Sequence, residues 1–288
     1  MIKTISLTVL LSAAVAAGYY MLQPAITVEA LSDNQEQPGN VANGAYLARI
    51  SGCIACHTDS ENNGKLVAGA PLDSPYGQFY APNLTTDSKT GIGSWTLNDF
   101  ARAVRQGISP EGSAYYPAFP YEFFGQLSDQ DVRDLWAAFR TVPPVNQPTP
   151  PSQLSFPYNL KQGLPVWQRL FQLSPDVTEE SDRGKYLTEA VGHCAACHTP
   201  RNLFGSLQQD QWLQGVEALG DAEAIPAITA SALRQNNWTV EDLAYALKTG
   251  ITPEGDALGG SMGEVIKHGS RFMSEADRQA IAKYLLSE

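Results

Sequence analysis

Apolar side chains recur at helical spacing in two stretches of the chain that lie far apart. They are Val132, Leu135, Trp136 and Phe139 in the first stretch, and Ile281, Tyr284 and Leu285 in the second. This spacing puts one apolar stripe on each helix, and the stripe must pack against another element. A glycine and a tyrosine recur in each of the segments 42–52 and 182–193, as Gly44 with Tyr46 and Gly184 with Tyr186. These segments are predicted to be the partner helices, with the glycine allowing close approach and the tyrosine filling space.

Four hydroxyl residues each precede a carboxylate by three positions, which is the pattern that caps the start of a helix. The pairs are Thr96 with Asp99, Ser128 with Asp131, Thr239 with Asp242, and Ser274 with Asp277. No stretch shows the alternating pattern of a strand at useful length. The patterns therefore predict an all-α fold that is mostly helical with long loops.

The chain contains two copies of one sequence unit. Its most similar segments are GISPEG at 107–112 and GITPEG at 250–255, which are 143 positions apart. Other matches occur in the same order at offsets between 140 and 146, so the similarity indicates duplication. We expect two tandem domains, at 41–142 and 178–288. A proline-rich connector at 143–177 is predicted to be extended and to lie on the surface.

The N-terminus is an export signal or a membrane anchor, assigned to 1–28, and a polar tether follows at 29–40. No charge occurs from Thr4 to Val28, and the apolar run from Ile5 to Leu22 has 18 residues, enough for one membrane span. Ala14 and Ala16 also offer a small-residue cleavage site. We expect a retained anchor with the domains on the periplasmic side of a bacterial inner membrane. The alternative is a cleaved signal and a soluble periplasmic protein.

Overall charge narrows the choice of partners. The sequence has 30 acidic and 19 basic residues, a formal net charge of −11. We therefore do not expect the protein to bind nucleic acid or anionic lipid through its overall charge. A basic protein partner stays open.

All four cysteines lie in two C-x-x-C-H motifs at equivalent places in the repeat. The motifs are Cys53, Cys56 and His57 in the first unit, and Cys194, Cys197 and His198 in the second. Two thiols on one helical turn can bind the two vinyl groups of one porphyrin, and the adjacent histidine can ligate its iron. A zinc site or a redox-active dithiol can have the same pattern of residues. Two motifs in a duplicated frame behind an export signal favour two covalently bound haem c groups.

A carrier haem needs a sixth ligand, usually a methionine sulfur. Met262 is the candidate in the second unit, whereas Met273 lies beside the Ser274 cap and is expected to pack in the core. The first unit has Phe119 at the position equivalent to Met262, and phenylalanine cannot bind iron. Three alternatives stay open there: an open or water-bound iron, a tyrosine oxygen, or a group from outside the unit such as Met21. The candidate tyrosines are Tyr115, Tyr116 and Tyr121.

The order of motifs resembles the diheme cytochrome c family, which is related to the cytochrome subunits of membrane-bound bacterial alcohol, gluconate and fructose dehydrogenases. The similarity covers about residues 40–288, and includes TGIGSWTLNDFARAVRQGISPEG, YYPAFPY and CAACHTPRN. The resemblance implies tandem cytochrome c-type haem domains, a dehydrogenase as electron donor, and a cytochrome or oxidase as acceptor. Relatives typically carry an axial methionine in the loop equivalent to YYPAFPY, and usually a third haem domain, which this sequence lacks.

Electron transfer between redox proteins of a respiratory chain is thus the leading functional hypothesis, and the chain is expected to be a carrier more than an enzyme. The alternative is a haem enzyme or small-ligand sensor that uses an open iron at the first haem.

Overall fold

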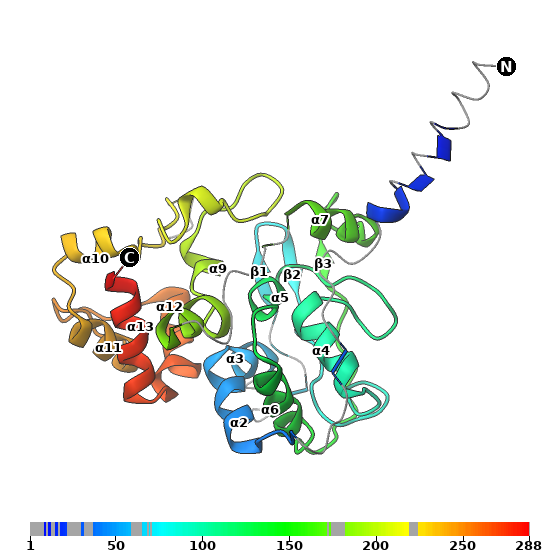
Figure 1. Ribbon diagram of the computed structural model, residues 1–288, viewed down its shortest axis with the longest axis horizontal. Helices are drawn as coiled ribbons and strands as arrows, with labels where there is room; N and C mark the ends of the chain where they lie inside the picture. Colours follow the sequence, from blue (N-terminus) through cyan, green and yellow to red (C-terminus); the bar gives the residue numbers. More distant parts are fainter. Residues whose placement is uncertain are drawn as a thin grey trace.

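The protein was analysed as a computed structural model, which describes residues 37–58, 65–67, 69, 71–171, 173, 182–218 and 224–287, with single positions and short pieces at 9, 11–12, 15–16, 18–21 and 30–31. The described part is rich in helices joined by long loops (Figure 1). In the first half the helices are α2 (Val41–Ile50), α3 (Cys53–His57), α4 (Leu97–Gln106), α5 (Tyr121–Phe124) and α6 (Asp129–Phe139). The short helices η2 (Lys161–Gly163) and α7 (Leu164–Phe171) follow. In the second half they are α8 (Arg183–Tyr186), η3 (Leu187–Val191), α9 (Ala195–His198), η4 (Gln209–Gln211), α10 (Ala230–Gln235), α11 (Val240–Thr249), α12 (Gly260–His268), η5 (Ser270–Phe272) and α13 (Glu275–Ser287).

The same close helix crossing occurs once in each half. A Cβ atom at Gly44 on α2 would lie 1.8 Å from the carbonyl oxygen of Asp134 on α6. A Cβ atom at Gly184 on α8 would lie 2.2 Å from the carbonyl oxygen of Ala280 on α13. The glycines therefore bring the backbones of the opening and terminal helices together, as their positions in the sequence predict.

The predicted helix caps form. Thr96 and Thr239 each make a complete capping box, in which the hydroxyl accepts from the amide three residues on and the aspartate accepts from the cap amide. Ser128 and Ser274 accept from the amides of Asp131 and Asp277. The second opening helix differs in detail from the prediction, because α8 is a single turn that continues as a π-helical segment, η3.

The described residues are mostly helical, as predicted, but they also include three short strands that the sequence did not indicate. A small antiparallel sheet has the order β1-β2-β3, formed by β1 (Leu72–Ser74), β2 (Gly77–Phe79) and β3 (Gln153–Leu154). Strands of two or three residues are too short to show an alternating pattern. Gly77 lies in the left-handed region, with φ 122°, and a Cβ atom there would come 2.2 Å from the carbonyl oxygen of Gln153. This glycine allows the connector strand to pair with the hairpin.

The segment 143–177 is extended only in part, because it contains α7. Pro165 is the second residue of α7, where the first turn tolerates a proline. Gln168, Arg169 and Leu170 are good helix formers, and the side chain of Gln168 is fully buried. Earlier in the connector, the side-chain amide of Asn83 donates to the carbonyls of Val145 and Gln147. The connector is thus bonded to the first half of the chain.

Most of the predicted N-terminal segment 1–28 lies outside the described residues. Positions 9, 11–12, 15–16 and 18–21 are helical. Within the described residues, no helix combines the length and the apolar character needed to cross a bilayer.

Candidate haem-attachment sites

The two C-x-x-C-H motifs lie on short helices that follow the opening helices. Cys53, Cys56 and His57 form α3, while Cys194 immediately precedes α9 and Cys197 and His198 end it. All four cysteines are free thiols, and in each motif the second one, Cys56 or Cys197, is exposed. Burial raises the pKa of Cys53 to about 11 and that of Cys194 to about 12, so these thiols are neutral at ordinary pH.

The histidine of each motif is held by the same contact. Nδ1 of His57 donates to the carbonyl of Pro82 over 2.7 Å, and Nδ1 of His198 donates to the carbonyl of Pro226 over 2.8 Å. A carbonyl oxygen only accepts, so the proton sits on Nδ1 and the lone pair of Nε2 is left for another partner. Burial lowers the pKa of both imidazoles, to about 4 for His57. This orientation by a second partner is typical of a histidine that ligates a metal.

The two motifs lie next to each other. A Cβ atom at Gly52, the residue before Cys53, would lie 3.8 Å from Cε1 of His193, the residue before Cys194. Desolvation by surrounding protein atoms raises the pKa of the Cys56 thiol, although the residue is partly open to solvent, and the nearby Cys197 thiol raises that pKa further. Segments that are far apart in the sequence therefore bring the two candidate attachment sites together.

Met262 lies in the first turn of α12 and not in a loop. Its side chain is half-buried, and α12 contacts α3 of the first motif. Met273 is buried in the core, as predicted from its place beside the Ser274 cap, and Leu127 at the equivalent position in the first half is buried too. The side chain of Met262 is therefore more exposed than that of Met273.

In the first half, Phe119 belongs to an aromatic cluster. Its ring packs against Tyr115, Tyr121 and Phe124 at centroid distances of 6.1, 6.4 and 5.8 Å. The Tyr116 hydroxyl donates to the carbonyl of Tyr158 and is thus engaged with the connector. The Tyr121 ring packs under Gly107, and its buried hydroxyl makes no hydrogen bond of good geometry within the described part. Burial, and to a smaller degree Glu111, raises the pKa of Tyr115 to about 12.

The position of His193 was not predicted from the sequence. Its imidazole is half-buried and packs beside Phe123 and Phe124, with ring centroids 6.0 and 5.4 Å away, so this residue of the second half packs against the first. His193 occupies the place equivalent to Gly52, directly before a motif, and its φ is 40°, in the left-handed region. That placement at the start of the motif was the signal available in the sequence.

The residues of each motif fit a covalently bound haem. Each motif offers two free thiols within one turn and an imidazole whose Nε2 is available, which is the donor set that such attachment needs. In the part of the chain that the structure describes, no three His, Cys, Asp or Glu side chains are grouped to hold a bare metal ion.

Known proteins are similar to this chain along most of its length. A diheme cytochrome c-type protein of Cereibacter sphaeroides is 38% identical over 256 residues, which is 86% of this chain and 85% of that protein. The chain belongs to the diheme cytochrome c family. No family model matches it.

Cytochrome subunits of dehydrogenases are similar as well. The fructose dehydrogenase cytochrome subunit of Gluconobacter japonicus is 36% identical over 86% of this chain. The gluconate 2-dehydrogenase cytochrome c subunit of Pantoea cypripedii is 37% identical over 91% of this chain. This diheme cytochrome spans 52% and 62% of the length of those two subunits. Electron transfer by a cytochrome c is thus the function that the family shares, and dehydrogenases are redox partners within it.

Proposed function

We propose that this chain is a two-haem electron carrier that takes electrons from a periplasmic dehydrogenase and passes them to a respiratory cytochrome or oxidase. Its haem domains are 41–142 and 178–288, and they attach haem through Cys53 with Cys56 and through Cys194 with Cys197. The observation that carries the proposal is the repeated contact from Nδ1 of His57 and His198 to a proline carbonyl. When bound, haem c supplies one-electron redox chemistry.

The protein's own residues orient and enclose the redox groups. Each proline carbonyl fixes one imidazole tautomer, which directs Nε2 toward the iron position. Met262 is proposed as the sixth ligand of the second haem, because it lies half-buried at the start of α12. Close contact between the motifs, at Gly52 and His193, favours a short path between the two haems.

Removing one pair of thiols tests the attachment. The holoprotein with Cys53→Ala and Cys56→Ala should keep one haem, and the matched variant with Cys194→Ala and Cys197→Ala should keep the other. Mass spectrometry of the polypeptide and pyridine haemochrome absorbance measure the haem content. A wild-type polypeptide without covalent haem would contradict the proposal.

A second candidate function concerns the first haem. Phe119 offers no iron ligand, and Tyr116 is bonded to the connector. Burial raises the pKa of Tyr115 and of Tyr121, which disfavours the phenolate form that would bind iron. We propose that this iron has an open coordination position, which separates its potential from that of the second haem. This position can also bind a small ligand, as in a haem enzyme or a sensor.

Carbon monoxide added to the reduced protein tests the open position. Half of the haem should shift its absorption, and the oxidised protein should show one high-spin and one low-spin iron by electron paramagnetic resonance. A purely low-spin spectrum with no shift would show that both irons are closed.

We further propose that the N-terminal segment anchors the protein to the periplasmic face of the membrane. The Arg169 guanidinium on α7 lies 4.2 Å from the centroid of the Tyr20 ring, so the apolar segment adjoins α7 (Figure 1). Near this point Leu170, Leu203 and Phe204 are exposed, and no acidic residue occurs from 135 to 175. Such a surface suits a lipid interface.

Flotation with phosphatidylcholine vesicles tests this location. The full chain should float with the vesicles, and a variant in which a cleavable export signal replaces residues 1–36 should stay in solution with both haems. Full chain that stays in solution would contradict the anchor.

A further inference from the structure

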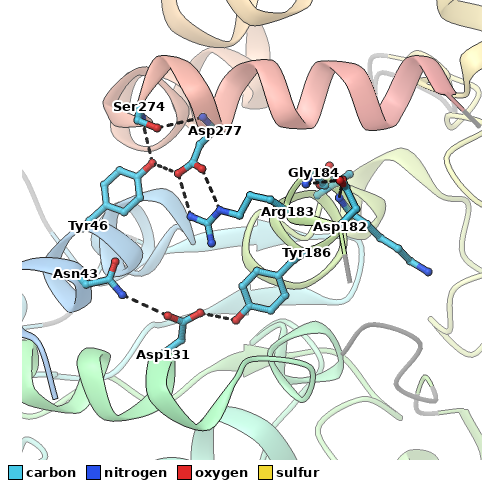
Figure 2. A network of polar contacts seen from close by, with 11 residues as sticks. Asn43, Tyr46, Asp131, Asp182, Arg183, Gly184, Tyr186, Ser274 and Asp277 are labelled. Atoms are coloured by element: carbon cyan, nitrogen blue, oxygen red, sulfur yellow. Dashed lines mark hydrogen bonds and ion pairs between the residues drawn. The ribbon is translucent and has the colours of Figure 1, made fainter. Parts of the chain in front are cut away.

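Two tyrosines join the two halves of the chain by matching contacts (Figure 2). The Tyr46 hydroxyl donates to Oδ2 of Asp277 over 2.6 Å and accepts from the amide of Ser274 over 3.0 Å. The Tyr186 hydroxyl donates to Oδ2 of Asp131 over 2.5 Å and accepts from the amide of Ser128 over 3.1 Å. Each hydroxyl is thus satisfied both as donor and as acceptor.

The contacts are exchanged between the halves. Tyr46 lies on opening helix α2 of the first half and binds the start of terminal helix α13 in the second. Tyr186 ends opening helix α8 of the second half and binds the start of terminal helix α6 in the first. The tyrosines were predicted to fill space within their own unit. Instead, their hydroxyls reach the other unit. Each tyrosine comes two residues after the glycine of its helix, which is about 200° around the helix axis and therefore away from the crossing that the glycine makes.

Each aspartate is also held by its own half. Arg183 donates to both carboxylate oxygens of Asp277 over 3.0 Å. Asn43, at the place equivalent to Arg183, donates to Asp131 over 3.3 Å. Each of the two carboxylates thus binds a tyrosine of the opposite half and a side chain of its own half. We call Tyr46, Asp277, Tyr186 and Asp131 the tyrosine clasp.

The clasp lies close in the chain to both candidate haem sites. Helix α2, which carries Tyr46, ends at Ile50 shortly before Cys53, and η3, which follows Tyr186, ends at Val191 shortly before Cys194. Helix α5, which follows Phe119, contacts η3 of the opposite half, and helix α12, which contains Met262, contacts α3 of the opposite half. A change of angle at the clasp would therefore change the separation of the two motifs. Electron tunnelling falls exponentially with distance, so that separation decides the rate.

We propose that the tyrosine clasp sets the distance between the two haems, and that Tyr46 and Tyr186 are positioning residues for electron transfer between them. This inference rests on the proposed function as a two-haem carrier. The clasp holds its geometry because both hydroxyls bind groups at the start of a helix, where amides have no partner in the helix itself.

The holoprotein variants Tyr46→Phe, Tyr186→Phe and the double variant test the clasp. Phenylalanine keeps the ring and removes only the hydroxyl. After rapid photoreduction, absorbance follows electron equilibration between the haems. Each single variant should slow electron equilibration several-fold. The double variant should slow it by more than the product of the two single effects, because in each single variant the remaining tyrosine contact still partly holds the two halves together.

Tyr284→Phe is the matched control. The Tyr284 hydroxyl donates to buried Glu189 over 2.5 Å, but both residues belong to the second half. This variant should unfold at a lower temperature and keep the wild-type rate of electron equilibration. An equal slowing in Tyr284→Phe, or wild-type rates in both clasp variants, would overturn the proposal.

A second readout does not depend on electron transfer. Calorimetry of the wild-type holoprotein should show one unfolding transition, because the clasp couples the halves, and the double variant should show two. Two transitions already present in the wild type would count against the clasp. If the double variant does not mature, the single variants carry the test, since each keeps one contact. Failure of the proposed function is recognised separately, as a wild-type protein with fewer than two haems.

Discussion

At the scale of single residues, Glu122 is the most perturbed carboxyl group near the Phe119 cluster. Its side chain is 3% exposed, and burial raises its pKa from 4.5 to about 7, against the opposing effect of Arg201. The folded state therefore binds more protons than the unfolded state between these values. The stabilising effect of the protonated group is complete below pH 4.5 and is lost as pH rises to about 7.

Glu122→Gln should remove that part of the pH dependence. The urea midpoint of the wild-type protein should fall between pH 5 and pH 8 relative to that of Glu122→Gln, a window that spans the pKa of about 7. Glu111→Gln, a change at an exposed position, is the control and should keep the wild-type profile. Parallel profiles for wild type and Glu122→Gln would show that Glu122 is ionised in the folded state.

Phe119 offers a second prediction at this scale. Phe119→Met places a thioether at the position equivalent to Met262, so it should ligate the first iron and raise its reduction potential. Carbon monoxide binding by half of the haem should disappear, and the methionine-to-iron charge-transfer band should double. Phe119→Leu has similar bulk without a donor and should still bind carbon monoxide. Unchanged carbon monoxide binding in Phe119→Met would place the first haem away from this loop.

At the scale of elements, the glycine crossings are the most constrained contacts of the fold. Alanine at 44 or 184 would put a Cβ atom about 2 Å from a backbone oxygen, where α6 or α13 would have to move. We expect Gly44→Ala and Gly184→Ala each to lower the free energy of unfolding by about 2–3 kcal/mol. Chemical denaturation of the holoprotein measures this change.

Gly163 provides the control for these crossings. No atom lies within 4 Å of a Cβ atom added there, so Gly163→Ala should leave stability within about 0.5 kcal/mol of wild type. A mild effect at both 44 and 184 would mean that the helices slide apart at little cost.

At the scale of the whole molecule, net charge governs encounters with redox partners. The chain carries −11. Raising the salt concentration should slow oxidation of the reduced protein by a cationic cobalt(III) complex and speed its oxidation by ferricyanide. Salt screens the attraction of the cation and the repulsion of the anion, because the Debye length falls from about 30 Å at 0.01 M to about 8 Å at 0.15 M. Stopped-flow absorbance measures both rates. A salt dependence of the same sign for both oxidants would contradict this.

The sequence alone determined the local features of this protein. It predicted the capped helices at Thr96 and Thr239, the glycine crossings and the two C-x-x-C-H motifs, because caps, apolar stripes and attachment motifs depend on residues close together in the chain. The resemblance to the diheme cytochrome c family, which the relatives confirm, rested on the same motifs. Met262 and the domain boundaries remain predictions.

Only the tertiary structure decided how these pieces meet. The tyrosines of the opening helices bind the opposite half, His193 packs beside Phe123 and Phe124, and a connector strand completes a small sheet. Each of these contacts joins residues that are far apart in the chain or lie in strands too short for a pattern. Local spacing carries no information about which of two similar helices a tyrosine will reach. That choice follows from how the two halves pack together.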